Sequence, residues 1–287
     1  MILLETLNSH PVYAIAVAFL FSLLIGSFLN VVIYRVPKMM ELEWQAQLEE
    51  MQGKEPEQET FNLAVPHSSC PKCGHRIRWY ENIPVLSYLM QRGRCNGCQT
   101  KISLRYPSVE LFTAIVSAFV VYLYGLNTVS LAVVFFTWVL ICLTLIDYDT
   151  QLLPDNITLP LLWLGLLINS FGAFTSLHMA VAGAMVGYLS LWSIYWVFKL
   201  LTGKEGMGYG DFKLLAALGA WAGVDQLPLI ILFSSLVGAI FGIMMIVLKQ
   251  HERQNPIPFG PYLAVAGWIT LIWGQEITYQ YLQFISV

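Results

Sequence analysis

Long apolar segments follow one another along most of this chain, separated by short polar ones. Eight segments approach the roughly 20 apolar residues that cross a bilayer as an α-helix. The predicted spans cover residues 12–34, 107–124, 128–146, 157–173, 179–200, 209–224, 227–248 and 261–283. They lack the period-two alternation of a membrane β-barrel. The pattern therefore predicts an all-α polytopic membrane protein of about eight transmembrane helices.

One polar stretch interrupts this pattern and defines the expected organisation. Residues 1–34 contain the first transmembrane helix, residues 35–105 form a polar insert, and residues 106–287 form a seven-helix membrane domain. The sixth span is short, because the eleven residues from Leu214 to Val224 make only about 16 Å of helix. We expect this helix to begin near Gly208, which draws Asp211 about one turn inside the membrane boundary.

The basic residues fix the orientation of this topology. Ten of the fifteen Lys and Arg lie between Arg35 and Arg105, and the other five fall in loops on the same side. By the positive-inside rule that side is cytosolic, so both termini face outward. Residues 1–11 carry no Lys or Arg, and the first span is too long for a signal peptide, so we expect a retained helix.

Composition agrees with a membrane protein. The 287 residues are 57% hydrophobic and 11% charged, which excludes an ordinary soluble domain. The net charge of −3 carries little information about partners. We expect the lipid bilayer, and no nucleic acid, among them; the oligomeric state stays open.

The first part of the insert is acidic. Seven glutamates lie between Glu41 and Glu59. This composition predicts a short acidic helix followed by a loose, solvated linker.

The second part of the insert carries two C-x2-C pairs, Cys70 with Cys73 and Cys95 with Cys98, separated by 21 residues. Two such pairs can aim four thiolates at one tetrahedral Zn²⁺ in a structural role, because four thiolates leave no open position. Two disulfides are the alternative, and a cytosolic location disfavours them. We expect His67 and His75 to be bystanders. Cys142, within an apolar span, is expected to be a small core residue.

Carboxylates at the membrane edge are costly and therefore candidates for function. They are Glu110, Asp147, Asp149, Asp155, Asp211 and Asp225. We expect Glu110 to have a surface or helix-start role, Asp149 to be exposed, Asp155 to cap a helix and Asp225 to be solvated.

Asp147 and Asp211 stand out, because each lies at the cytosolic end of a span. Two neighbouring carboxyls that share a proton can perform acid–base chemistry on an amide. Gly208 and Gly210 would let the backbone approach a peptide closely. The alternative is that Asp211 caps a helix and Lys213 anchors it at the membrane surface. Spacing alone leaves both interpretations open.

Several motifs together resemble a known family, the type 4 prepilin peptidases, which are GxGD-type membrane aspartic proteases. They are "GSFLNVVIYRVP" at 26–37, the double C-x2-C insert with "NIPVLSY" and "ISLRYPSVE", "LIDYDTQLLPD", and "GYGDFKLLAALGAW". The resemblance implies cleavage of the basic leader from type IV prepilins and type II secretion pseudopilins at the cytosolic face of the bacterial inner membrane. It places the catalytic pair on Asp147 and Asp211. It also implies N-methylation of the new N-terminus with S-adenosylmethionine, at a site that no motif locates.

Two rival functions are a presenilin-like protease that cuts within the bilayer and a small permease with a zinc-stabilised loop. Two further hypotheses concern substrate. The proline-rich "NPIPFGPYLAV", with Pro258 and Gly260, could hydrogen-bond an extended substrate or simply begin the last span. The glutamates from Glu41 to Glu59 could steer a basic leader or simply tether the zinc insert.

Overall fold

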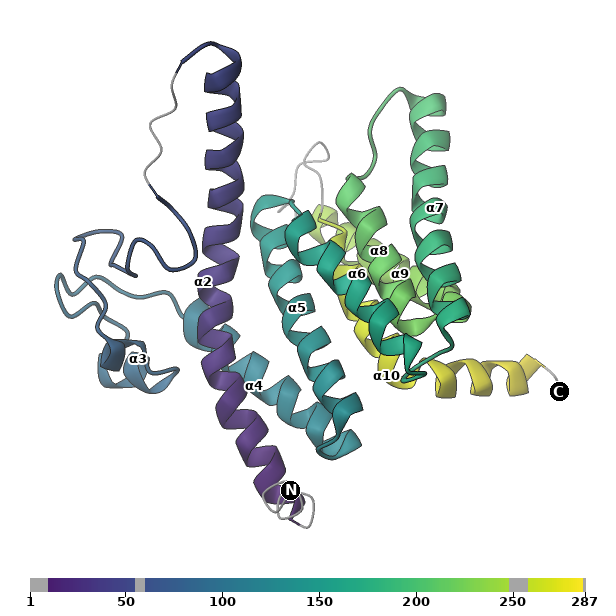
Figure 1. Ribbon diagram of the computed structural model, residues 1–287, viewed down its shortest axis with the longest axis horizontal. Helices are drawn as coiled ribbons and strands as arrows, with labels where there is room; N and C mark the ends of the chain where they lie inside the picture. Colours follow the sequence, from purple (N-terminus) through teal and green to yellow (C-terminus); the bar gives the residue numbers. More distant parts are fainter. Residues whose placement is uncertain (1–9, 55–59, 248–257, 286–287) are drawn as a thin grey trace. The chain divides into compact units, whose positions relative to one another are not determined.

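The computed structural model describes residues 10–54, 60–247 and 258–285, and these residues form a helical protein (Figure 1). Within those ranges there is no β-strand, only two isolated β-bridges. The helices are α2 (Pro11–Met51), η1 (Trp79–Asn82), α3 (Leu86–Met90), α4 (Arg105–Tyr124), α5 (Thr128–Thr150), α6 (Asp155–Ser170), α7 (Leu177–Thr202), α8 (Tyr209–Ala222), η2 (Val224–Gln226), α9 (Leu227–Val247) and α10 (Gly260–Ile285).

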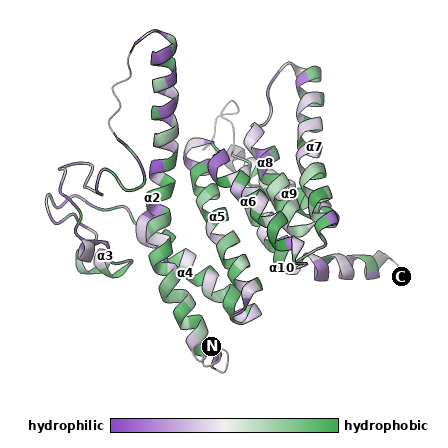
Figure 2. Cartoon of the chain, in the orientation of Figure 1, coloured by the Kyte–Doolittle hydropathy of each residue, from purple (hydrophilic) through white to green (hydrophobic). Residues whose placement is uncertain are grey.

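Each of the eight expected spans coincides largely with one helix, which confirms the predicted all-α fold class. Among the described residues, five stretches of helix are both long and apolar enough to cross a membrane: α2, α4, α5, α7, and η2 with α9. Figure 2 shows the hydrophobic residues that dominate these helices. Helices α6 and α8 have only 16 and 14 residues. The number of complete crossings therefore stays a prediction.

The chain divides into two compact units, residues 1–138 and 139–287. In the first unit α4 packs closely on α2, because Gly26 has no side chain. A Cβ at this position would lie 2.7 Å from the Cα of Glu110. The amide of Asn30 donates to the carbonyl of Tyr106 at 3.1 Å and adds a polar link between the same helices. The expected three-part division at residues 34 and 105 remains an expectation.

Helix α2 is longer than the pattern predicts. It runs unbroken for 41 residues through Pro37 to Met51, about 62 Å in length. The glutamates up to Glu50 therefore extend the first helix, whereas the sequence predicted a separate short one. Physically, the polar residues after the span are good helix formers, and no Gly interrupts them before Gly53. Glu55, Glu57 and Glu59 lie outside the described residues.

Arg35 fastens the return of the chain to α2. Its side chain is buried, and its guanidinium donates to the carbonyls of Asn62 at 2.7 Å and Pro66 at 2.6 Å. The ring of Phe61 lies under this guanidinium and under the ammonium of Lys38, at 5.5 and 5.2 Å. The segment that follows Arg35 therefore returns to Arg35 at Asn62 and Pro66.

In the second unit α8 forms the centre of a helix bundle. Residues 214–221 are all buried, against α6, α7 and α10. Gly183 of α7 and Gly219 of α8 meet backbone to backbone, since a Cβ on either one would overlap the carbonyl of the other. Small residues of this kind let membrane helices approach closely. Because residues 214–221 of α8 are apolar and buried, they hold the first turn of this helix in a fixed position.

Candidate active site and metal centre

The two candidate catalytic carboxyls both belong to the second unit. Asp147 lies in the last turn of α5, and Asp211 lies in the first turn of α8. Both are buried, with 5% and 7% of their surface exposed. Leu153 links the two positions, because it packs against Gly210, next to Asp211, and against Gly260, whose N–H donates to Asp147. The fold thus brings together the two carboxylates that the sequence singled out.

The carboxyl of Asp147 is held by the start of α10. The backbone N–H of Gly260, the first residue of α10, donates to Oδ2 of Asp147 at 2.9 Å. The first N–H groups of a helix have no partner within the helix, and they favour an anion. A Cβ at residue 260 would stand 2.6 Å from Oδ2. Glycine at this position is therefore a condition for the contact.

Leu153 lines the same region. A Cβ at Gly210 would lie 2.7 Å from Cβ of Leu153, and one at Gly260 would lie 3.3 Å from Cδ1 of Leu153. The leucine therefore packs against the backbone on both sides of the carboxyl pair. This packing keeps part of the site apolar and explains why the residue before Asp211 has no side chain.

The three glycines before Asp211 lack a side chain for different structural reasons. A Cβ at Gly206 would lie 2.9 Å from the ring of Phe198, and Gly210 lies against Leu153. Gly208 is exposed, and a Cβ there would be 3.9 Å from Oδ2 of Asp211, with no closer neighbour. None of the three has a positive φ. Gly208 therefore leaves room beside a carboxyl, whereas Gly206 and Gly210 allow close packing.

The other membrane-edge carboxylates have separate surroundings. Asp155 is the first residue of α6, after a Pro154 cap, and pairs with Lys213 of α8 at 2.6 Å. Asp149 and Asp225 are exposed, as expected. The surface or helix-start role predicted for Glu110 is wrong, because only 8% of this residue is exposed.

The burial of Glu110 follows from two close contacts that the sequence does not reveal. The approach of α4 to Gly26 covers it on one side. On another side its Oε2 accepts the N–H of Val85 at 2.8 Å. Glu110 therefore joins the insert to α4 within the first unit.

The four cysteines of the insert form a cluster that fits a tetrahedral metal. All four are free thiols, and their sulfur atoms lie within 4.8 Å of one another. Cys70 and Cys98 are 3.8 Å apart, and Cys73 and Cys95 are 3.9 Å apart. Four ligands at a Zn–S distance of about 2.3 Å would be about 3.8 Å apart. The cluster thus has the size of a zinc site.

The two C-x2-C turns have the same backbone design. Cys70 N–H donates to the carbonyl of His75, and Gly74 N–H donates to that of Cys70, each at 2.9 Å. In the second turn Cys95 and Gln99 repeat both contacts at the same distance. Gly74 and Gln99 both have a positive φ, +70° and +60°. Gln99 therefore holds a backbone conformation that favours glycine.

Glu81 connects the two turns, a role that the sequence analysis missed. Its carboxylate accepts from Arg78 N–H at 2.8 Å, from the amide of Asn96 at 2.6 Å and from Nε2 of His75 at 3.2 Å. The hydrogen bond from Arg78 N–H, followed by that from Asn96, lowers the pKa of Glu81 to about 2. His75, expected to be a bystander, supports the cluster through this carboxylate. The only signal in the sequence is an acidic residue between the two cysteine pairs.

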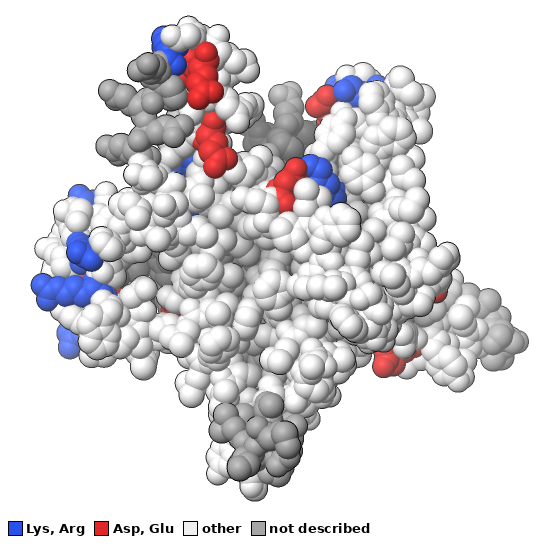
Figure 3. All heavy atoms as spheres, viewed as in Figure 1, with Lys and Arg blue, Asp and Glu red and all other residues white. Residues whose placement is uncertain are grey.

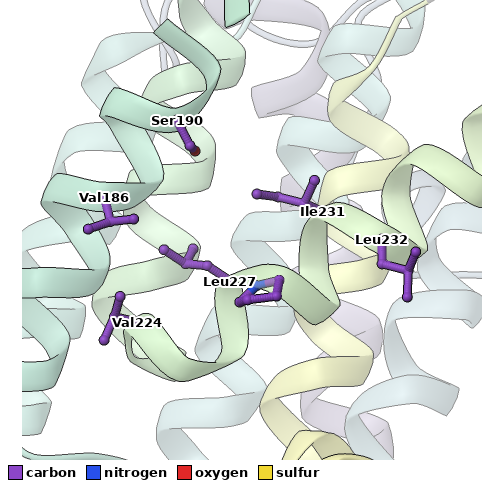
Figure 4. Close-up of a pocket in the computed structure, with 7 residues that line it drawn as sticks. Val186, Ser190, Val224, Leu227, Ile231 and Leu232 are labelled. Carbon is purple, nitrogen blue, oxygen red and sulfur yellow. The ribbon is translucent and has the colours of Figure 1, made fainter. Parts of the chain in front are cut away.

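An apolar pocket of about 510 Å³ lies elsewhere in the second unit, between α7 and the start of α9 (Figure 4). Its lining residues are Val186, Ser190, Val224, Leu227, Pro228, Ile231 and Leu232. Neither candidate catalytic carboxyl lines this pocket.

Figure 3 shows that much of the displayed face lacks charged side chains, as expected for helices in lipid.

Known proteins match nearly the whole length of this chain. Residues 20–124 match the bacterial peptidase A24 N-terminal domain, and residues 134–243 match the type IV leader peptidase family. A protein of Pseudomonas aeruginosa named prepilin leader peptidase/N-methyltransferase is 57% identical over 284 residues, 98% of both chains.

Two more relatives carry the same name. One, from Aeromonas salmonicida, is 57% identical over 288 residues and covers 99% of both chains. The other, from Neisseria gonorrhoeae, is 52% identical over 260 residues and covers 90% of both. No solved structure matches this chain.

Proposed function

This chain belongs to the type IV leader peptidase family, and from that premise we propose that it is a bifunctional prepilin leader peptidase and N-methyltransferase. Its substrates would be type IV prepilins and type II secretion pseudopilins. It would work in the bacterial inner membrane, with the zinc insert and the carboxyl pair at the cytosolic face and both termini in the periplasm. Full-length similarity at this level does not favour a presenilin-like protease or a permease.

In the proposed peptidase reaction Asp147 and Asp211 are the catalytic residues. One carboxylate takes a proton from water while the oxygen of that water attacks the scissile carbonyl carbon. The other carboxyl gives its proton to the carbonyl oxygen. The C–N bond then breaks, and the departing amine takes up a proton. The observation that carries this proposal is the burial of both carboxyls around Leu153, which packs against Gly210 beside Asp211 and against Gly260, the donor to Asp147.

The surrounding backbone supports these roles. The N–H of Gly260 fixes Oδ2 of Asp147, which leaves Oδ1 as the oxygen that would accept the water proton. Gly208 leaves space next to Oδ2 of Asp211, where an extended substrate would lie. Gly210 allows the close packing on Leu153 that keeps this turn in position. The N–H of Gly260 therefore serves a carboxyl of the enzyme, and in our proposal it is not a clamp for substrate.

The proposed zinc ligands belong to the insert, in the first unit. Cys70, Cys73, Cys95 and Cys98 would hold one structural Zn²⁺ that stabilises the insert. S-adenosylmethionine, which the name of the relatives suggests, would supply the methyl group for the new N-terminal amine. We assign no residue to its binding.

The central experiment separates the two activities. Cleavage of a prepilin and methylation of an already cleaved peptide are measured in Asp147→Asn, Asp211→Asn and the exposed neighbour Asp149→Asn. We expect the first two variants to lose cleavage and to keep methylation, and Asp149→Asn to keep both. Near-normal cleavage in Asp147→Asn or Asp211→Asn would refute the proposed catalytic pair.

A second experiment tests the metal. The purified protein should contain about one equivalent of zinc, because four thiolates make one tetrahedral site. A Cys70→Ser, Cys73→Ser double variant should lose the metal and accumulate to a lower level. Full zinc content in that variant would exclude the proposed site.

A further inference from the structure

The loop that leads to Asp211 is fastened to the end of α7 by charged and polar contacts. Lys199, in the last turn of α7, donates from Nζ to Oε1 of Glu205 at 2.8 Å and to the hydroxyl of Tyr195 at 3.1 Å. The carbonyl of Lys199 also accepts the N–H of Gly203 at 2.9 Å, where the helix ends in a left-handed residue. Lys199 therefore binds the loop at two points.

Aromatic contacts continue this attachment as far as the catalytic turn. Tyr195 is 3% exposed, and its ring lies 5.3 Å from that of Tyr209 and 5.7 Å from that of Phe212. These two rings flank Asp211 in the sequence and are themselves 5.3 Å apart. The same Tyr195 thus contacts the lysine that holds the loop and two rings, one two positions before Asp211 and one directly after it.

The surroundings of the lysine favour this arrangement. Its ammonium lies over the rings of Tyr195 and Trp196, at 5.4 and 5.5 Å. Glu205 and Lys199 have 68% and 34% of their side chains exposed, so the ion pair itself adds little stability. The pair therefore acts through geometry, because it joins Glu205 of the loop to the last turn of α7.

We propose that Tyr195, Lys199 and Glu205 act together as a clasp that positions Asp211 for peptide cleavage. They are positioning residues, because they act through the loop and through the rings of Tyr209 and Phe212. The clasp holds the loop before Gly208, and Gly208 forms the N-terminal cap of α8, where Asp211 lies in the first turn. This inference rests on the proposed function.

The expected size of the effect follows from the precision that such a reaction needs. A displacement of about 1 Å at a reacting group can cost about 100-fold in rate. A released loop would leave Asp211 attached to the rigid part of α8, so we expect a smaller loss. Lys199→Met, Glu205→Gln and Tyr195→Phe should each lower kcat for cleavage by about tenfold, with KM unchanged.

The test compares these variants with a matched control. Lys204 is an exposed lysine of the same loop, so Lys204→Met removes one positive charge and leaves the side-chain contacts of Lys199 with Tyr195 and Glu205 in place. Methylation of a cleaved peptide and the thermal midpoint, measured in parallel, show whether each variant is folded. The exchanged double variant Lys199→Glu, Glu205→Lys restores an ion pair and should recover at least part of the lost kcat.

Three results in kcat would overturn the clasp: parent kcat in Lys199→Met, Glu205→Gln and Tyr195→Phe, an equal loss in Lys204→Met, or an exchanged double variant no better than Lys199→Glu and Glu205→Lys measured singly. A change confined to KM would also overturn it, because it would make Glu205 a substrate contact. Failure of the proposed catalytic pair is recognised separately, since cleavage would then persist in Asp147→Asn or Asp211→Asn.

Discussion

Replacing Gly260 by alanine tests how closely Asp147 is held for catalysis. The added Cβ would stand 2.6 Å from Oδ2 of Asp147, whereas ordinary contact begins at 3.4 Å. The carboxyl must therefore move by about 0.8 Å, the difference between these two distances. Because misplacement by about 1 Å can cost about 100-fold, we expect kcat for cleavage to fall by between about 10-fold and 100-fold. The variant keeps the backbone N–H of residue 260, so the loss of kcat would come from displacement of the Asp147 carboxyl.

The assay measures steady-state cleavage of a detergent-solubilised prepilin, together with methylation of a cleaved peptide as the control for folding. Gly208→Ala is the matched variant, because its Cβ has no neighbour closer than 3.9 Å. That methyl group leaves both carboxyls in place and narrows the space beside Asp211. We therefore expect Gly208→Ala to raise KM and to change kcat little.

Two outcomes would refute this reasoning. The first is a parent kcat in Gly260→Ala, which would mean that Asp147 need not be held. The second is an identical loss of kcat in both alanine variants, which would mean that any side chain added near the site disturbs it. Loss of methylation along with cleavage would indicate general misfolding and would also contradict the local displacement that we expect.

Three further predictions concern the insert and α2. Gln99→Gly should stabilise the zinc-loaded insert by about 1 kcal/mol against thermal unfolding, because glycine adopts a positive φ without strain; an unchanged midpoint would contradict this. Glu81→Gln should destabilise the insert at neutral pH. Since folding lowers the pKa of Glu81 to about 2 from an ordinary 4.5, the stability difference from the parent should be constant between about pH 5 and pH 8, where the thiolates can hold zinc; an unchanged thermal midpoint at neutral pH would refute it. If the acidic end of α2 attracts a basic leader, Glu49→Gln with Glu50→Gln should lower kcat/KM at low salt only, whereas a parent salt profile would leave this segment as a tether.

The helices and the two candidate carboxyls could be picked out from the sequence, because both depend on local pattern. Runs of apolar residues predict the spans, and the short run after Leu214 predicts that its helix begins near Gly208, as it does. Asp147 and Asp211 could be singled out because each is a charge beside such a run. Their proximity could only be inferred from the resemblance, since no local rule joins residues on different helices.

The contacts that hold these residues were not predictable in the same way. Gly260 and Asp147 are 113 positions apart, and their link uses a backbone N–H, which every residue except proline has. The links of Glu81 to Asn96 and of Glu110 to Val85 also depend on how distant segments fold together. The sequence pattern could suggest which carboxylates lie in unusual surroundings. Only the folded structure shows which groups donate hydrogen bonds to them.

Arg35 closes the excursion of α2 at its base, and this has a consequence for engineering and for divergence of the chain. The segment from Lys38 to Phe61 leaves and rejoins the body of the first unit at a single anchored neck. Doubling the length of a flexible connection costs only about 0.6 kcal/mol in closure entropy, and α2 itself ends at Met51. Insertions, deletions or an affinity tag placed after Met51 should therefore leave the cysteine cluster and both membrane units intact, whereas the same change between Arg105 and Glu110 should not.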